Sequence, residues 1–121
     1  MQTLFLDKNT NMLNVIDINP DIHSEVKKYI DCDNWDAPLH RIGQIRYRII
    51  VDDNSWPLED ILHSDERVSA VTSSGRPLLF GNILFFRDGD MLDELTEDDI
   101  RNITRHTVTL PSKGLVVVVS E

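Results

Sequence analysis

Apolar and polar positions alternate most clearly from Gln44 to Asp52. One face of this stretch carries Ile45, Tyr47, Ile49 and Val51, and the other carries Gln44, Arg46, Arg48 and Ile50. A period of two, with β-branched and aromatic side chains, predicts a strand with one buried face. The two arginines predict that the other face is solvated or meets acidic neighbours.

The N-terminal part predicts two strands followed by a helix. Apolar residues at 4–6 and at 12, 13, 15, 16 and 18 flank the polar segment Asp7–Asn11, whose composition is typical of a turn. Asn19 and Pro20 predict a helix start, with Asn19 as N-cap and Pro20 at the first helical position. The helix is expected to end near residues 31–33, and its apolar face is expected to carry Ile22, Val26, Tyr29 and Ile30.

Residues 68–87 predict a β-hairpin. Two apolar runs, Val68–Thr72 and Leu78–Arg87, flank the turn residues Ser73–Pro77. Gly81 marks a bulge or a close backbone approach within the second run. Near the end of the sequence, Leu115–Val119 is apolar on both faces, which predicts a strand inside a sheet rather than at its edge.

The best helix start in the sequence is at Thr96. Thr96 as N-cap and Asp99 three residues later approximate a capping box, although Glu or Gln is the usual partner. Leu95 and Ile100 occupy the two positions of a hydrophobic staple. A second main helix is therefore expected from about residue 97.

These elements predict one α+β domain over residues 1–121, with a mostly antiparallel sheet and two main helices. The expected order is β-β-α-β-(short α)-β-β-α-β. The short helix is placed at Trp56–Leu62, with Ser55 as its candidate cap. The stretch Asp33–Gly43 is expected to be a polar connection.

Charge and composition narrow the classes of partner. The 21 acidic and 12 basic side chains give a net charge of −9, which argues against direct binding to nucleic acid. This charge is compatible with solubility by self-repulsion or with a protein partner that is itself basic. No apolar run is long enough to span a membrane, and the N-terminus lacks a basic leader. The single Cys32 cannot form an internal disulfide. We therefore expect a cytoplasmic protein without membrane contact.

The densest group of candidate binding residues is acidic. It lies between residues 88 and 99 and consists of Asp88, Asp90, Asp93, Glu94, Glu97 and Asp98, with Asp99 as the helix-capping seventh member. Clustered carboxylates suit hard cations, but the calcium-loop pattern fails because its sixth position is not glycine. We expect no metal and no cofactor, and we expect either a solvated acidic face or a surface for a basic partner.

No catalytic residue is predicted. The histidines His23, His40, His63 and His106 are far apart, so a zinc site built from them and Cys32 stays an alternative without spacing to support it. Cys32 with His40 as its base would need contact in the fold. Trp35 and Trp56 lie in polar connections, where they either cover the edge of the core or serve as aromatic contacts for a partner.

Residues 75–100 resemble part of a known group of small domains. The segments Gly75-Arg76-Pro77, Leu79–Phe86, Asp88-Gly89-Asp90 and Leu95–Ile100 are similar to small domains of unknown function encoded by bacterial phages and mobile elements. This resemblance implies an accessory protein of such an element. It implies no activity and no site residues, because the group has no assigned activity.

Two functions are therefore expected. The first is a non-enzymatic interaction or accessory protein that acts through protein–protein contacts. The alternative is an acidic mimic of DNA that inhibits a host nuclease or DNA-binding protein, with carboxylates in place of phosphates. The oligomeric state is open, and the apolar final strand could pair across a homodimer.

Overall fold

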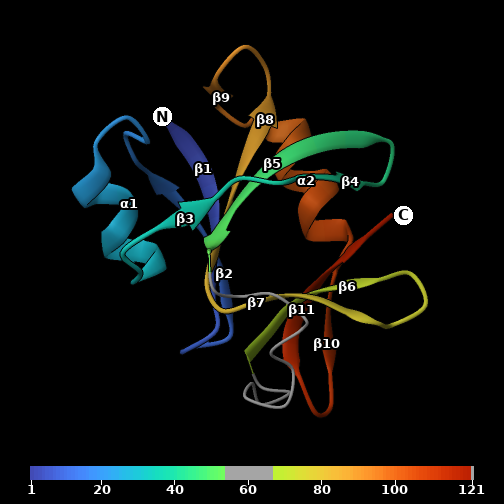
Figure 1. Cartoon of the computed structure of the whole chain (residues 1–121). Coiled ribbons are helices and arrows are strands. Elements are labelled where there is room, and N and C mark those ends of the chain that lie inside the picture. Colours follow the sequence, from blue (N-terminus) through green and yellow to red (C-terminus); the bar gives the residue numbers. More distant parts are fainter. Residues whose placement is uncertain (54–66, 121) are drawn as a thin grey trace.

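Two β-sheets and two helices form the part of the chain that the computed structural model describes, residues 1–53 and 67–120 (Figure 1). The larger sheet has the order β2-β1-β8-β5-β3, with β4 paired to β5 and β9 paired to β8. Its strands are β1 (Gln2–Asp7), β2 (Met12–Asp17), β3 (Trp35–Asp36), β4 (Leu39–Ile42), β5 (Ile45–Asp52), β8 (Ile83–Asp88) and β9 (Leu92–Asp93).

The smaller sheet has the order β10-β11-β6-β7. Its strands are β6 (Val68–Thr72), β7 (Pro77–Phe80), β10 (Thr107–Leu110) and β11 (Gly114–Val119). Among the described strands, β11 and β6 form the one parallel pair, and all other pairings are antiparallel.

The larger sheet is the middle layer of the fold. Helix α1 (His23–Ile30) covers one face, where its Val26 shares a buried apolar cluster with Phe5 of β1. Helix α2 (Glu97–Arg105) and the smaller sheet cover the other face, where Ile103 shares a cluster with Leu4 and Leu6. Successive residues of β1 therefore belong to two separate cores, as strand alternation requires.

The predicted fold class is correct only in its coarse form. Strands hold 50% of the residues and helices 17%, so the described chain is β-rich and divided into two sheets rather than clearly α+β. The expected connection Asp33–Gly43 contains β3 and β4, because pairing with β5 satisfies backbone groups in a segment without local strand periodicity. The short helix predicted at 56–62 lies outside the described residues, and the single domain stays a prediction.

The expected strand 78–87 is two strands that belong to different sheets. Gly81 has φ of +82°, and its N–H donates to the Arg67 carbonyl at 2.7 Å. The Asn82 side chain then accepts from the Lys8 N–H at 2.8 Å and donates to the Tyr29 carbonyl at 3.1 Å. The close approach expected at Gly81 is thus observed, and this glycine lets the chain pass from the smaller to the larger sheet.

Helix α1 begins later than the sequence predicts. Its N-cap is Ile22, which makes no side-chain capping bond, and the Asn19 side chain instead accepts from the Asp21 N–H at 3.1 Å. Asn19 and Pro20 therefore form a turn before the helix, and Ile22 is exposed rather than on the buried face. The predicted end is confirmed, since Asp31 is a left-handed C-cap with φ of +53°.

Three other local predictions are confirmed. Thr96 and Asp99 form a reciprocal capping box at the start of α2. The strand β11 lies inside its sheet, between β10 and β6. On β5, Arg46 and Arg48 meet an acidic neighbour, because their side chains lie 3.8 Å and 3.6 Å from the carboxylate of Asp88.

Two hydroxyl substitutions should change stability in opposite directions. In the described part of the chain, the Ser69 hydroxyl is buried without a hydrogen-bond partner, whereas the Thr3 hydroxyl donates to the Phe85 carbonyl. Ser69→Ala should raise the free energy of unfolding by about 1 kcal/mol, and Thr3→Val should lower it by about 1 kcal/mol. Urea denaturation of the two variants tests this, and a loss of stability in both would contradict it.

Candidate functional site: an acidic groove beside strand β2

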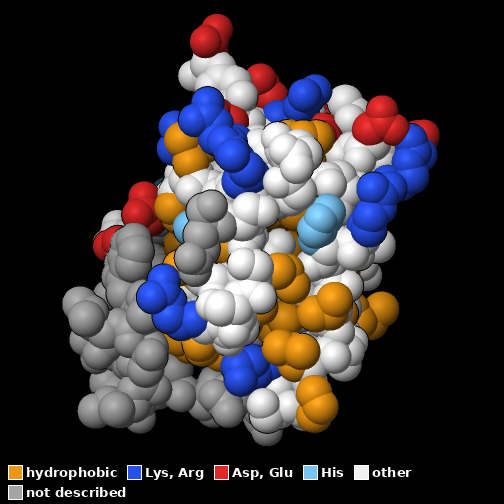
Figure 2. Space-filling model, turned by 90° about the vertical axis from the view of Figure 1, so that its right-hand side faces the viewer, with side chains coloured by type: hydrophobic (Ala, Val, Ile, Leu, Met, Phe, Trp, Pro, Cys, Tyr) orange, Lys and Arg blue, Asp and Glu red, His pale blue; other side chains and the backbone are white. Residues whose placement is uncertain are grey.

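Several of the predicted acidic residues are already paired within the chain. Asp88 is partly buried beside Arg46 and Arg48, and the Asp98 carboxylate pairs with the Arg101 guanidinium one helical turn away. Figure 2 shows basic and acidic side chains next to one another at the top of the face in view. The acidic segment is therefore not one continuous anionic surface.

The other four acidic residues are exposed. The Asp93 carboxylate lies against Gly89, so close that a Cβ added to this glycine would be 1.8 Å from it. The Asp93 side chain therefore folds back over the turn that precedes β9. The side chains of Asp90 and Glu97 are exposed and make no hydrogen bond within the described chain. The Glu94 carboxylate accepts the Gln2 N–H at 2.6 Å, which ties the segment before α2 to the start of β1.

Two adjoining hollows lie between strand β2 and helix α2. One of about 470 Å³ is lined by Met1, Gln2, Val15, Ile16, Asp17 and Glu94. The other, of about 410 Å³, is lined by Gln2, Val15, Glu97, Ile100 and Arg101. Because they share Gln2 and Val15, they form one open depression, called the β2–α2 groove below. It brings together Glu94 and Glu97 from the predicted set and Asp17 from outside it.

The capping geometry of α2 places the two glutamates at this groove. Leu95 lies between them, is 2% exposed, and donates its N–H to the Gln2 carbonyl at 3.1 Å. The capping box at Thr96 then turns the chain directly into the helix, so Glu97 occupies its first turn. A buried leucine thus anchors the segment and leaves a carboxylate exposed on each side.

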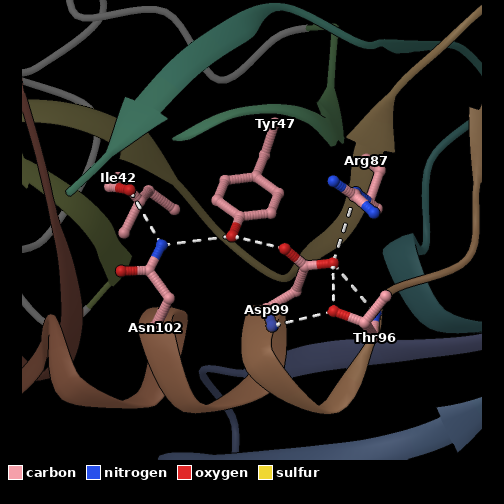
Figure 3. A network of polar contacts seen from close by, with 6 residues as sticks. All are labelled: Ile42, Tyr47, Arg87, Thr96, Asp99 and Asn102. Carbon is pink, nitrogen blue, oxygen red and sulfur yellow. Dashed lines mark hydrogen bonds and ion pairs between the residues drawn. The ribbon is translucent and has the colours of Figure 1, made fainter. Parts of the chain in front are cut away.

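A buried polar network holds α2 against the larger sheet (Figure 3). The Asp99 side chain is 2% exposed, and its carboxylate accepts from the Tyr47 hydroxyl at 2.9 Å. It also accepts from the N–H and the hydroxyl of Thr96, both at 2.9 Å, and lies 3.4 Å from Nε of Arg87. The carboxylate that caps the helix therefore also joins it to β5 and β8.

Asn102 completes this network one turn along α2. Its side-chain N–H group donates to the Ile42 carbonyl at 2.9 Å and to the Tyr47 hydroxyl at 3.1 Å (Figure 3). Burial raises the pKa of Tyr47 to about 12, so the phenol stays protonated at neutral pH and donates to Asp99. These polar groups satisfy one another, so the network holds α2 in position against β5 and β8.

Lys8 is a second buried polar centre, which the sequence did not single out. Its ammonium group donates to the Lys113 carbonyl at 2.8 Å, to the Leu115 carbonyl at 2.5 Å and to the Asn11 side chain at 3.2 Å. Burial, with a smaller effect of Arg67, lowers the pKa of Lys8 to about 8. Lys8 therefore links the β1–β2 turn to the β10–β11 turn.

The candidate nucleophile is chemically unpromising. Burial raises the pKa of the Cys32 thiol to about 11, so little thiolate exists at neutral pH. Burial also lowers the pKa of His40, and within residues 1–53 and 67–120 no hydrogen bond joins it to Cys32. In the same ranges no three His, Cys, Asp or Glu side chains are grouped to hold a metal, and His63 lies outside them.

Trp35 covers an edge of the core. It is partly buried on β3, packs against the apolar cluster under α1, and stacks on the His23 ring with 4.2 Å between ring centroids. Its indole is therefore partly engaged within the chain. Trp56, the other candidate aromatic contact, lies outside the described residues.

Comparisons with known protein families, curated proteins and solved structures find no match to this chain. The resemblance of residues 75–100 to phage and mobile-element domains stays a prediction. No helix within the described ranges is long and apolar enough to cross a membrane.

Proposed function

We propose that this chain is a non-enzymatic interaction protein that binds a basic segment of a protein partner. The observation that carries the proposal is the β2–α2 groove, where Asp17, Glu94 and Glu97 surround an exposed apolar surface around Val15. Carboxylates around an apolar floor favour a ligand that is both apolar and cationic. An accessory role in a phage or mobile element, in the cytoplasm, is part of the proposal.

The placement of the perturbed side chains supports binding rather than catalysis. Catalytic sites gather groups with shifted pKa values in one hollow. In the described chain, burial shifts the pKa values of Lys8, Cys32, His40 and Tyr47, and none of these side chains lines the groove. The Met1 ammonium does line the groove, and its hydrogen bond to Asp17 raises its pKa, which keeps it protonated rather than making it a base. The four buried groups belong to separate parts of the fold.

DNA mimicry stays the alternative with less support. A mimic needs free carboxylates spaced along one surface, in place of phosphates. Arginines already pair with Asp88 and Asp98, two of the six acids that the mimic would present. If the chain is a DNA mimic, neutralising exposed acids remote from the groove should weaken its binding to the partner. If the partner binds in the groove, the same substitutions should leave binding unchanged.

A pull-down from cells that contain the natural partner tests the proposal. The wild-type chain should capture a basic protein that is lost at high salt, because exposed charges are screened. Glu94→Gln with Glu97→Gln should reduce capture roughly fivefold. The charge-matched control, Asp21→Asn with Asp90→Asn, removes two exposed acids that do not line the groove, and it should bind like wild type. Equal loss in both double variants would favour mimicry and contradict the proposal.

A further inference from the structure

Strand β2 is an unprotected sheet edge. Among the described strands it pairs with β1 alone, through a regular register of six residue pairs. It contains no proline, lysine or bulge, the usual features that block an edge. The other edge strands are shorter, because β3 and β9 have two residues each and β4, β7 and β10 have four, and β7 also begins at Pro77 with an irregular register.

The register identifies which backbone groups of β2 are free. The Ile18 N–H donates to the Met1 carbonyl at 2.9 Å, so this pair is hydrogen-bonded and extends the register of β1 with β2. In an antiparallel pair such residues alternate with residues whose N–H and C=O groups point away from the partner strand. The outward-pointing residues of β2 are therefore Leu13, Val15 and Asp17.

The β2–α2 groove lies beside these outward groups. Val15 is 56% exposed on the side of β2 that faces α2, where it lines the groove with Ile100. Three carboxylates line the groove, from Asp17, Glu94 and Glu97. Two cationic groups also line it, and both are already paired: the Met1 ammonium lies 2.5 Å from the Asp17 carboxylate, and the Arg101 guanidinium pairs with Asp98.

We propose that β2 takes up an extended basic segment of a protein partner as an added strand, which specifies how the proposed function is carried out. The backbone of the segment would pair with Leu13, Val15 and Asp17, as in known strand-addition complexes. Alternate side chains of the segment would face the groove, where Lys or Arg complements the carboxylates. A second copy of this chain fits less well, because each copy has a net charge of −9.

Amide hydrogen exchange of the whole chain tests the proposal residue by residue. The probe is a synthetic octapeptide of alternating valine and lysine. Without peptide, the outward amides of Leu13, Val15 and Asp17 should exchange fast, and the β1-facing amides of Asn14 and Ile16 should exchange slowly. Saturating peptide should slow the outward amides about tenfold or more. Unchanged exchange at the outward amides overturns strand addition, whether or not the peptide binds.

Two variations separate backbone pairing from charge attraction. A peptide N-methylated at alternate residues keeps its charge but lacks donors along one edge, and it should bind about tenfold more weakly. Val15→Pro removes an outward N–H without removing a bond to β1, and it should weaken binding similarly, whereas Val15→Thr keeps the N–H and should not. Equal binding of the methylated and unmethylated peptides would contradict the proposal.

The outcomes also distinguish this proposal from the proposed function. Salt-sensitive binding that depends on Glu94 and Glu97, with no protection of β2, would leave the basic-partner function standing and remove strand addition. Protection of β2 that rises with protein concentration without peptide would show a second copy on the edge and overturn the basic occupant. Protection of the outward β2 amides that appears only when peptide is added, and that is lost in Val15→Pro, supports both strand addition and the basic-partner function.

Discussion

Asp99→Ala is expected to lower the free energy of unfolding by about 3–5 kcal/mol. The Asp99 carboxylate is 2% exposed and accepts from Tyr47 and Thr96 while it faces Arg87. Its removal takes the acceptor from the buried phenol, breaks the capping box, and leaves the guanidinium without its buried anion. Urea denaturation measures the loss.

The neighbouring Asp98 provides the matched control for this prediction. It is the same residue type in the same helical turn, but it is exposed and contacts Arg101 at the surface. Asp98→Ala should lower the free energy of unfolding by less than about 1 kcal/mol. Equal effects of the two substitutions would show that the buried network does not hold α2 in place.

Lys8 should give the protein a stability that rises with pH between about 8 and 10.5. The pKa of Lys8 is about 8 in the folded protein, against the ordinary value of 10.5 for a lysine side chain. In this range the unfolded chain binds a proton that the folded chain does not, so the free energy of unfolding increases with pH. The gain from this residue over the whole range is up to about 3 kcal/mol.

Comparison with Lys8→Met isolates the contribution of Lys8. Cys32 has a raised pKa of about 11, so its own contribution falls as pH rises above 9 and opposes that of Lys8. Both proteins retain Cys32, and the difference between their free energies of unfolding cancels its effect. That difference should shift in favour of wild type as pH rises from 8 to 10.5. Parallel pH profiles would contradict the burial assigned to Lys8.

Local patterns in the sequence were enough to predict elements whose causes are also local. The capping box depends on side chains three residues apart, and the alternation of β5 depends on neighbours along one strand. Both predictions are confirmed because the local pattern agrees with the fold around it: the capping box forms within α2, and β5 pairs with its neighbouring strands. The predicted start of α1 was wrong because the Asn19 side chain accepts from the Asp21 N–H in a turn instead of capping the helix.

Features that depend on distant contacts could not be predicted. The run 78–87 is apolar apart from Gly81, Asn82 and Arg87, and Gly81 indicated a bulge or a close approach within one strand rather than a division between two sheets. Strands β3 and β4 exist through pairing with β5, which their own sequences do not encode strongly. In the sequence, Lys8 looks like an ordinary lysine in a turn. Only the fold shows that the β10–β11 turn lies over it and supplies carbonyl groups to its ammonium.

The candidate site was predicted in part. Glu94 and Glu97 were among the expected acidic residues, and the structure places them at one groove. Asp88 and Asp98 were expected beside them, but arginines from β5 and α2 pair with them. Val15 and Asp17 were missed as site residues, because the sequence does not show that β2 is a free edge.

Site-specific photo-crosslinking tests the central claim most directly, namely that the β2–α2 groove is where a basic protein partner binds. A photoreactive amino acid replaces Val15 in one sample and the exposed, remote Asp90 in another, and both are irradiated in cells that contain the partner. We predict a basic protein crosslinked from position 15 and lost when Glu94→Gln and Glu97→Gln are added, with little product from position 90. Crosslinking from position 90 alone, or from neither position, would contradict the claim.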